Sequence, residues 1–192
     1  MRASSDNHVK SFLSGFNIKL GLIAWLAMLG FDFFLHGGVL AGIYTGESQF
    51  LLPSMEAFRR IPLGYLSFLI TAFFLLWIAL RLDINNVKDG LLMGLGLGVV
   101  MWAAFGLGMY SITTAEPSTL LAWVVSESLK MALAGGLIGV ALRDQNLRQA
   151  FKIALVAAIF LVLLTIILQS LNLAPSTQIA QEFNNLPNMK LK

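Results

Sequence analysis

Five long apolar runs, separated by shorter polar segments, make up most of the chain. Each run is long enough to cross the hydrocarbon core of a bilayer, which takes about 20 helical residues. The runs are unbroken and lack the alternation typical of membrane β-barrel strands. The sequence therefore predicts an all-α bundle of five transmembrane helices, over residues 16–38, 62–80, 90–112, 118–142 and 151–173.

The segments between and beyond these runs are polar. Residues 1–15 and 174–192 form polar ends, and the first span is expected to be retained, although 20–31 has the length of a signal-peptide core. The first connection is long, and its stretch "FLLPSMEAF" suits a short interfacial amphipathic helix. The later connections are short, so we expect the last four helices to pack as antiparallel neighbours in sequence order.

Composition agrees with a membrane protein. Of the 192 residues 57% are hydrophobic and 12% are charged, about half the charged share of a soluble domain. The absence of cysteine excludes disulfides and thiolate metal sites. The net charge of +3 comes from basic residues that flank the apolar runs, which argues against a nucleic-acid partner.

The basic residues also predict the orientation, because cytoplasmic loops are enriched in Lys and Arg. Most of them fall on the side of the N-terminus: Arg2, Lys10, Lys19, Arg81, Lys88, Arg143, Arg148 and Lys152. Arg59, Arg60, Lys190 and Lys192 lie on the other side. We therefore expect a multi-pass protein of a bacterial inner membrane with a cytoplasmic N-terminus.

Small residues recur at four-residue spacing in two of the predicted helices. They are Gly90, Gly94 and Gly98 in the third, and Ala132 and Gly136 in the fourth. In lipid, such residues let two helix backbones approach closely. We expect these helices to pack on each other, and a seam with a partner is the alternative. The fifth predicted helix has bulky side chains on all sides, so we expect it to be peripheral and to face lipid or another protein.

Ionisable residues inside the predicted spans are the candidate site. Asp32 and His36 share one face of the first helix, and Glu127 and Lys130 lie in the fourth. The predicted orientation places all four in the outer half of the bundle. The same half holds the polar residues Tyr65, Tyr110, Ser126 and Ser128, with Tyr44 in the outer connection.

Two interpretations of this cluster stay open. Charges inside a bilayer are costly, so the four groups should pair with one another, either to fix helix register or to form a site for a ligand, proton or ion. Asp32, His36 and Glu127 are possible metal donors, but the set is small and Lys130 would repel a cation, so no metal is expected. The sequence leaves any cofactor unknown. Trp77 and Trp123 fit an interfacial aromatic belt.

One resemblance rests on the first helix and the connection after it. Asp32, His36 and Gly37, followed by Tyr44 and "LLPSMEAF", resemble small uncharacterised bacterial integral membrane proteins, four-helix families of unknown function. The resemblance extends over residues 30–142. It implies a helical bundle and transfers no catalytic residue.

No enzymatic signature occurs in the sequence: it lacks a Walker loop, H-E-x-x-H, G-x-S-x-G and a dinucleotide fingerprint. Our first hypothesis is a non-enzymatic accessory or structural subunit of a membrane complex, with protein partners or further copies of itself. The alternative is a small oligomeric transporter or channel with a proton or ion path through the polar cluster. The third hypothesis is a membrane-embedded lipid or cofactor binder.

Overall fold

The computed structural model describes residues 14–44, 50–52 and 54–175, and over these residues it is helical without strands. Five helices are long and apolar enough to cross a membrane, as the sequence predicts. They are α2 (Gly15–Phe34, continued by the turn η1, Leu35–Val39), α3 (Ser54–Arg81), α4 (Val87–Ile112), α5 (Pro117–Asp144) and α6 (Leu147–Ser170). Most of both predicted polar ends lies outside the described residues.

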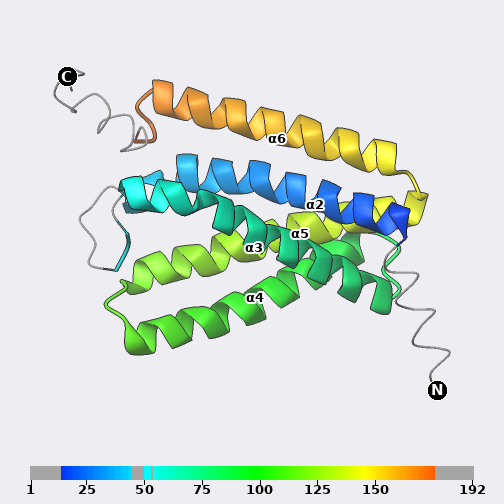
Figure 1. The fold of residues 1–192 in the computed structure, drawn as a ribbon, viewed down its shortest axis with the longest axis horizontal. Helices are drawn as coiled ribbons and strands as arrows, with labels where there is room; N and C mark the ends of the chain where they lie inside the picture. The colour runs from blue at the N-terminus through cyan, green and yellow to red at the C-terminus, as the bar shows by residue number, and fades with distance from the viewer. Residues whose placement is uncertain (1–13, 45–49, 53, 176–192) are drawn as a thin grey trace, which may run out of the picture.

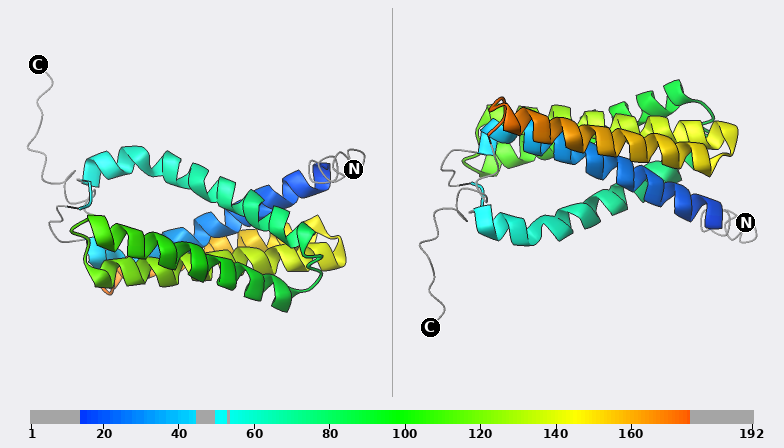
Figure 2. Two further views of the ribbon diagram at one scale, coloured as in Figure 1. Left: turned by 90° about the horizontal axis from the view of Figure 1, so that it is seen from below. Right: turned by 90° about the horizontal axis from the view of Figure 1, so that it is seen from above.

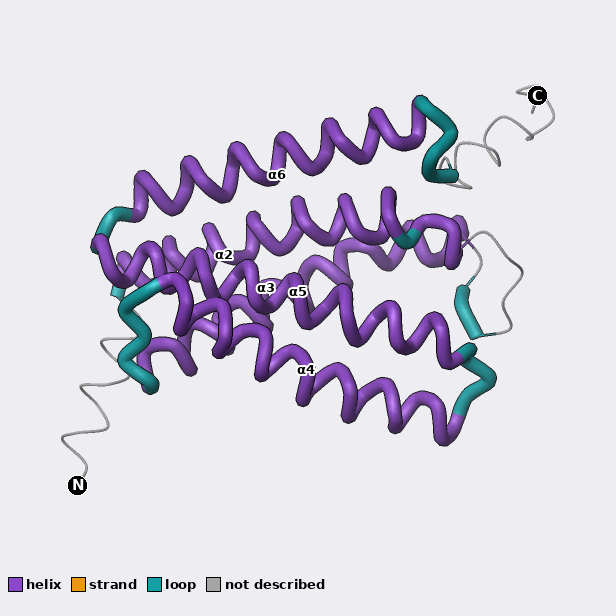
Figure 3. The backbone as a smooth tube through the Cα atoms, turned by 180° about the vertical axis from the view of Figure 1, so that it is seen from behind, coloured by secondary structure: helices purple, strands orange, loops and turns teal. Residues whose placement is uncertain are grey.

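The helices run alternately up and down between two ends of an elongated bundle (Figure 1). One end holds η1 and the short 3₁₀ turn η2 (Ala41–Tyr44), the start of α5 and the end of α6; we call it the Tyr44 end. The short loops that join α3 to α4 and α5 to α6 lie at the opposite end (Figure 3). Helix α5 forms the centre of the bundle. In its apolar 18-residue stretch 72% is buried, more than in the corresponding stretch of the other four helices.

Local signals in the sequence set several helix ends. Ser14, Asn86 and Asn146 each precede a helix, and each side-chain oxygen accepts a hydrogen bond from a backbone N–H in the first turn. Pro117 opens α5, where a missing N–H costs nothing. Gln145 ends α5 in the left-handed conformation with φ 49°. Pro117, Gln145 and Asn146 set the helix ends at the last two connections, which are short.

Helices α4 and α5 form the tightest pair, and the predicted small-residue stripe lies in their seam. A Cβ added at Gly90 would overlap the carbonyl of Gly135, and one at Gly94 would overlap the carbonyl of Met131. A Cβ at Gly98 would lie 2.6 Å from the Cα of Ser128. Of the two interpretations of the stripe, packing within one chain is the one that the structure shows.

Helix α6 packs mainly on α2, and here the sequence interpretation needs a correction. A Cβ on Gly30 would lie 2.6 Å from the Cα of Ala158, so the two backbones are close. Ala150 and Ala154 are buried on the same helix. The first half of α6 therefore packs through small residues. The sequence interpretation missed them because it was based on the bulky second half of the helix. The outer face of α6 is exposed, as expected of a peripheral helix.

Helix α3 differs most from the prediction. It begins at Ser54 and not at Pro62, so the described part of the segment expected to be an interfacial helix forms its first turn. Pro62 is accommodated inside the helix, as often happens in membrane helices. Nor is α3 a close neighbour of α4: its second half packs on α2 and α5, and its first half diverges from the bundle (Figure 2).

The core lies between the Lys130 level and the end opposite Tyr44. It is built from small and apolar side chains of α2, α3, α5 and α6: Leu20, Ala24, Met28, Leu75, Leu76, Ala79, Met131, Ala134, Ile138, Ala141, Ala150 and Ala154. The charged groups of the candidate site therefore lie at one side of a dry core.

Candidate functional site

Lys130 is the centre of the intramembrane charge cluster, which we define as Asp32, His36, Glu127 and Lys130. Its side chain is completely buried, and its Nζ lies 2.5 Å from Asp32 Oδ1 and 2.5 Å from Glu127 Oε1. The ring of Phe68 on α3 covers the ammonium group, with its centroid 3.7 Å from Nζ. Two carboxylates and an aromatic face thus compensate the buried cation, and together with Phe68 the cluster joins α2, α3 and α5.

His36 extends the cluster toward the Tyr44 end. Its Nε2 lies 3.5 Å from Asp32 Oδ1 and 3.7 Å from Glu127 Oε1. The imidazole belongs to the π-helical turn η1, in which Leu40 N donates to Leu35 O at 2.7 Å. A π-turn inserts one extra residue per turn and is frequent at functional sites. On α6, Gln169 Nε2 supports this turn by donating to Gly37 O at 2.8 Å.

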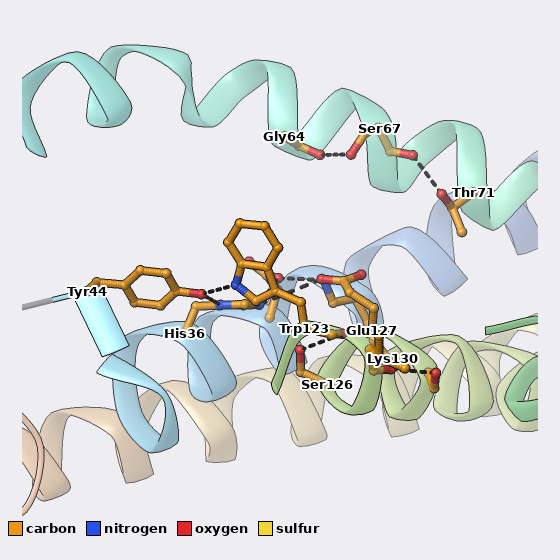
Figure 4. Close-up of polar contacts among 12 residues, drawn as sticks. His36, Tyr44, Gly64, Ser67, Thr71, Trp123, Ser126, Glu127 and Lys130 are labelled. Atoms are coloured by element: carbon orange, nitrogen blue, oxygen red, sulfur yellow. Dashed lines mark hydrogen bonds and ion pairs between the residues drawn. The ribbon is translucent and has the colours of Figure 1, made fainter. Parts of the chain in front are cut away.

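Tyr44 and Trp123 complete the hydrogen-bonded chain (Figure 4). Tyr44 Oη lies 2.6 Å from His36 Nδ1, and it accepts a hydrogen bond of 2.8 Å from Trp123 Nε1. Burial raises the pKa of Tyr44 to about 12, and the negative charges of Asp32 and Glu127 act in the same direction. Tyr44 is therefore a neutral hydroxyl at any physiological pH. The indole N–H of Trp123 is thus used in a hydrogen bond to Tyr44, which the assignment of Trp123 to an interfacial aromatic belt did not predict.

Four further residues were predicted to lie in this half of the bundle, and the structure places them outside the charge cluster. The hydroxyls of Ser126 and Ser128 donate to backbone carbonyls of their own helix. Tyr65 offers its backbone carbonyl to Trp25 Nε1 at 2.8 Å, and its ring contacts Phe68. Tyr110 is 58% exposed and lines an apolar groove of about 480 Å³ between α4 and α5.

The donor atoms of Asp32, His36 and Glu127 lie within 4.8 Å of one another, a spacing that a metal ion could bridge. Lys130 Nζ, however, contacts an oxygen of each carboxylate at 2.5 Å. The ammonium group therefore occupies the position where a cation would be stabilised. This arrangement does not fit a divalent metal unless Lys130 is displaced or loses its proton.

Sequence reasoning brought the four charged groups together but missed two of their contacts, that of Lys130 with Phe68 and that of His36 with Tyr44. Phe68 follows Tyr65 by three residues, and no charge or polarity marked it as a partner of Lys130. Tyr44 comes eight residues after His36, across the π-turn and the 3₁₀ turn. Regular α-helical spacing cannot predict that Tyr44 lies beside His36, because π-helical and 3₁₀ segments have a different number of residues per turn from an α-helix.

Comparison of the chain with protein-family models, with curated proteins and with solved structures finds no match.

Proposed function

We propose that this protein is a non-enzymatic, multi-pass subunit that assembles with other transmembrane helices through the outer face of α4. The observation that carries the proposal is a second row of small residues on this helix. Gly96, Ala104 and Gly108 follow one ridge at multiples of four residues, with Val100 between them. All four positions are exposed, and a Cβ at Gly96 or Gly108 would meet nothing within 4 Å.

The inner glycine row and the outer row of α4 have different surroundings. The row of Gly90, Gly94 and Gly98 is in backbone contact with α5. The outer row has no helix against it in the described chain. In lipid, helix association depends on close packing at small residues, since apolar surface alone gives no drive between helices. An outer row that holds Gly96, Ala104 and Gly108 is therefore a surface suited to another helix.

The first half of α3 supports the same proposal. From Glu56 to Ser67 every residue is exposed except Tyr65, which is intermediate. This half carries the ion pair of Arg60 with Glu56, whose nitrogen and oxygen lie 2.6 Å apart. A transmembrane helix that leaves its own bundle offers its sides to a neighbouring chain.

The rival functions need features that the described residues do not supply. A transporter or channel needs a polar route across the membrane. Beyond Lys130 the core of the described bundle consists of side chains such as Met28, Leu76 and Ile138, which offer no such route. The charge cluster is also internally paired, because every buried side-chain nitrogen and oxygen in the described part of the chain has a hydrogen-bond partner. The proposed location remains a bacterial inner membrane with the N-terminus cytoplasmic.

The test compares two glycine substitutions on opposite faces of α4. Protein extracted from its own membranes in mild detergent is weighed by native mass spectrometry, where one chain weighs 21.0 kDa. We expect a larger mass for the wild type, reduced to one chain by Gly96→Leu without loss of thermal stability. Gly94→Leu serves as the contrast, because it should damage the fold itself. A wild type of single-chain mass, or an assembly unaffected by Gly96→Leu, contradicts the proposal.

A further inference from the structure

His36 is the group that links the two parts of the polar network. Its Nδ1 contacts Tyr44 Oη at 2.6 Å, and its Nε2 faces the carboxylates of Asp32 and Glu127 at 3.5 and 3.7 Å. Its side chain is 24% exposed, whereas that of Lys130 is completely buried. Of the two, His36 is the one whose side chain reaches the surface of the described bundle.

The hydrogen bonds of Tyr44 favour one tautomer of neutral His36. The indole N–H of Trp123 can only donate, so Tyr44 Oη must accept that bond. Tyr44 keeps its own hydroxyl proton, because burial raises its pKa to about 12. This proton can therefore be donated to His36 Nδ1, which leaves the ring N–H at Nε2, directed at the two carboxylates.

The charges around the imidazole show what a bound proton would change. With neutral His36, the carboxylates of Asp32 and Glu127 face the single ammonium of Lys130, and the cluster has one net negative charge. Among the described residues, α6 brings Thr165 and Gln169 to this turn and α3 brings Tyr65, which interacts with Asp32. These neighbours add hydrogen-bonding groups but no further ion pair to the cluster. One proton on His36 makes the cluster neutral.

We propose that His36 is a proton-binding site that switches the charge cluster between a net-negative and a neutral state. A hydronium ion at the Tyr44 end transfers its proton to Nδ1 and becomes water, while the Tyr44 O–H turns away and Oη accepts the new N–H. No electrons move, and the proton leaves by the same route. The apolar core beyond Lys130 leaves this site open from one side. This inference is independent of the assembly proposed for α4.

The experiment uses the full chain with His8→Gln, which leaves His36 as its only histidine. The imidazole nitrogens are labelled with ¹⁵N, and spectra are recorded in lipid nanodiscs between about pH 5 and pH 9. We expect the neutral ring to carry its proton at Nε2 and to gain a second proton at Nδ1 as the pH falls. Tyr44→Phe should remove the hydrogen bond seen at Nδ1, and the matched Tyr110→Phe should change neither nitrogen signal.

Glu127→Gln tests the charge argument. Removing a negative charge 3.7 Å from Nε2 should lower the affinity of His36 for its second proton at least about tenfold. Asp32→Asn makes the same test if the Glu127 variant does not fold. The inference is overturned if the neutral ring is protonated at Nδ1 or if His36 gains no proton in this range. An unchanged proton affinity in a folded carboxylate variant overturns it as well.

Discussion

Replacing Lys130 by methionine removes the ammonium that Asp32 and Glu127 share and keeps much of the side-chain volume. With His36 neutral, both carboxylates then face each other at the edge of a dry core without a cation. Removing one partner of a buried ion pair costs about 3–5 kcal/mol, because the partner's charge stays buried and uncompensated. The charges left behind belong to Glu127 and Asp32, whose side chains are 8% and 17% exposed, so the lower part of this range applies.

The variant can relieve this penalty by protonating one carboxyl group, which gives a second estimate. A glutamate of ordinary pKa, about 4.3, takes up a proton at pH 7 at a cost of about 3.7 kcal/mol. At pH 5 the same proton costs about 1 kcal/mol. The loss of stability of Lys130→Met should therefore be about 3–4 kcal/mol at pH 7 and should shrink to about 1 kcal/mol at pH 5.

The assay is reversible unfolding in mixed micelles titrated with a denaturing detergent, at both pH values. Lys152→Met is the matched control, because Lys152 is exposed on α6 and its removal should cost less than about 0.5 kcal/mol. The triple variant Asp32→Asn, Glu127→Gln, Lys130→Met should recover most of the loss. A loss below about 1 kcal/mol at pH 7, or one of equal size at both pH values, refutes the reasoning.

Two further predictions concern the packing of α4 and the hydroxyl of Tyr44. Gly94→Leu should lower the free energy of unfolding by at least about 2 kcal/mol, because its Cβ would overlap the carbonyl of Met131. In the same detergent titration, Gly96→Leu should lower it by less than about 1 kcal/mol. Equal losses in the two variants would contradict the described packing of α4 on α5. The ultraviolet absorbance of tyrosinate, wild type minus Tyr44→Phe, should place the pKa of Tyr44 near 12. Since the folded state keeps a proton that the unfolded state releases above about pH 10, stability should fall between about pH 10 and 12, and a Tyr44 signal that rises near pH 10 would contradict its burial.

The sequence predicted the number of spans and the α4–α5 seam because both depend on local patterns. Length and hydropathy identify a span, and four-residue spacing of Gly90, Gly94 and Gly98 identifies a close helix contact. The start of α3 was placed too late, because Pro62 looked like a boundary. In the structure the helix continues through this proline.

The arrangement of helices was less predictable than their existence. Short connections suggested that α3 and α4 are neighbours, yet α3 packs on α2 and α5. A short loop brings together two helix ends but does not fix the angle at which the helices diverge. The contact of Gly30 with Ala158 joins residues that are distant in sequence, so no local pattern could pair them.

The existence of the charge cluster was predictable from the energetic cost of placing charges inside a membrane. The contacts that its residues make with other side chains were not predictable. Charged groups inside a membrane need partners, which predicted that Asp32, His36, Glu127 and Lys130 pair with one another. The roles of Tyr44, Trp123 and Phe68 depend on the π-turn and on how α3 crosses the bundle. Neither feature leaves a periodic signal in the sequence.

Cysteine cross-linking in native membranes tests the proposed assembly most directly, because the chain has no cysteine of its own. A single cysteine is placed at Gly96, on the outer row of α4, or at Val156, which is 66% exposed on α6. The account predicts that Gly96→Cys, treated with an oxidant or a short thiol-reactive cross-linker, joins a second copy or a partner chain in high yield, while Val156→Cys stays a single chain. If Gly96→Cys also stays a single chain, or both positions cross-link equally, α4 is not the assembly surface and the proposed function is contradicted.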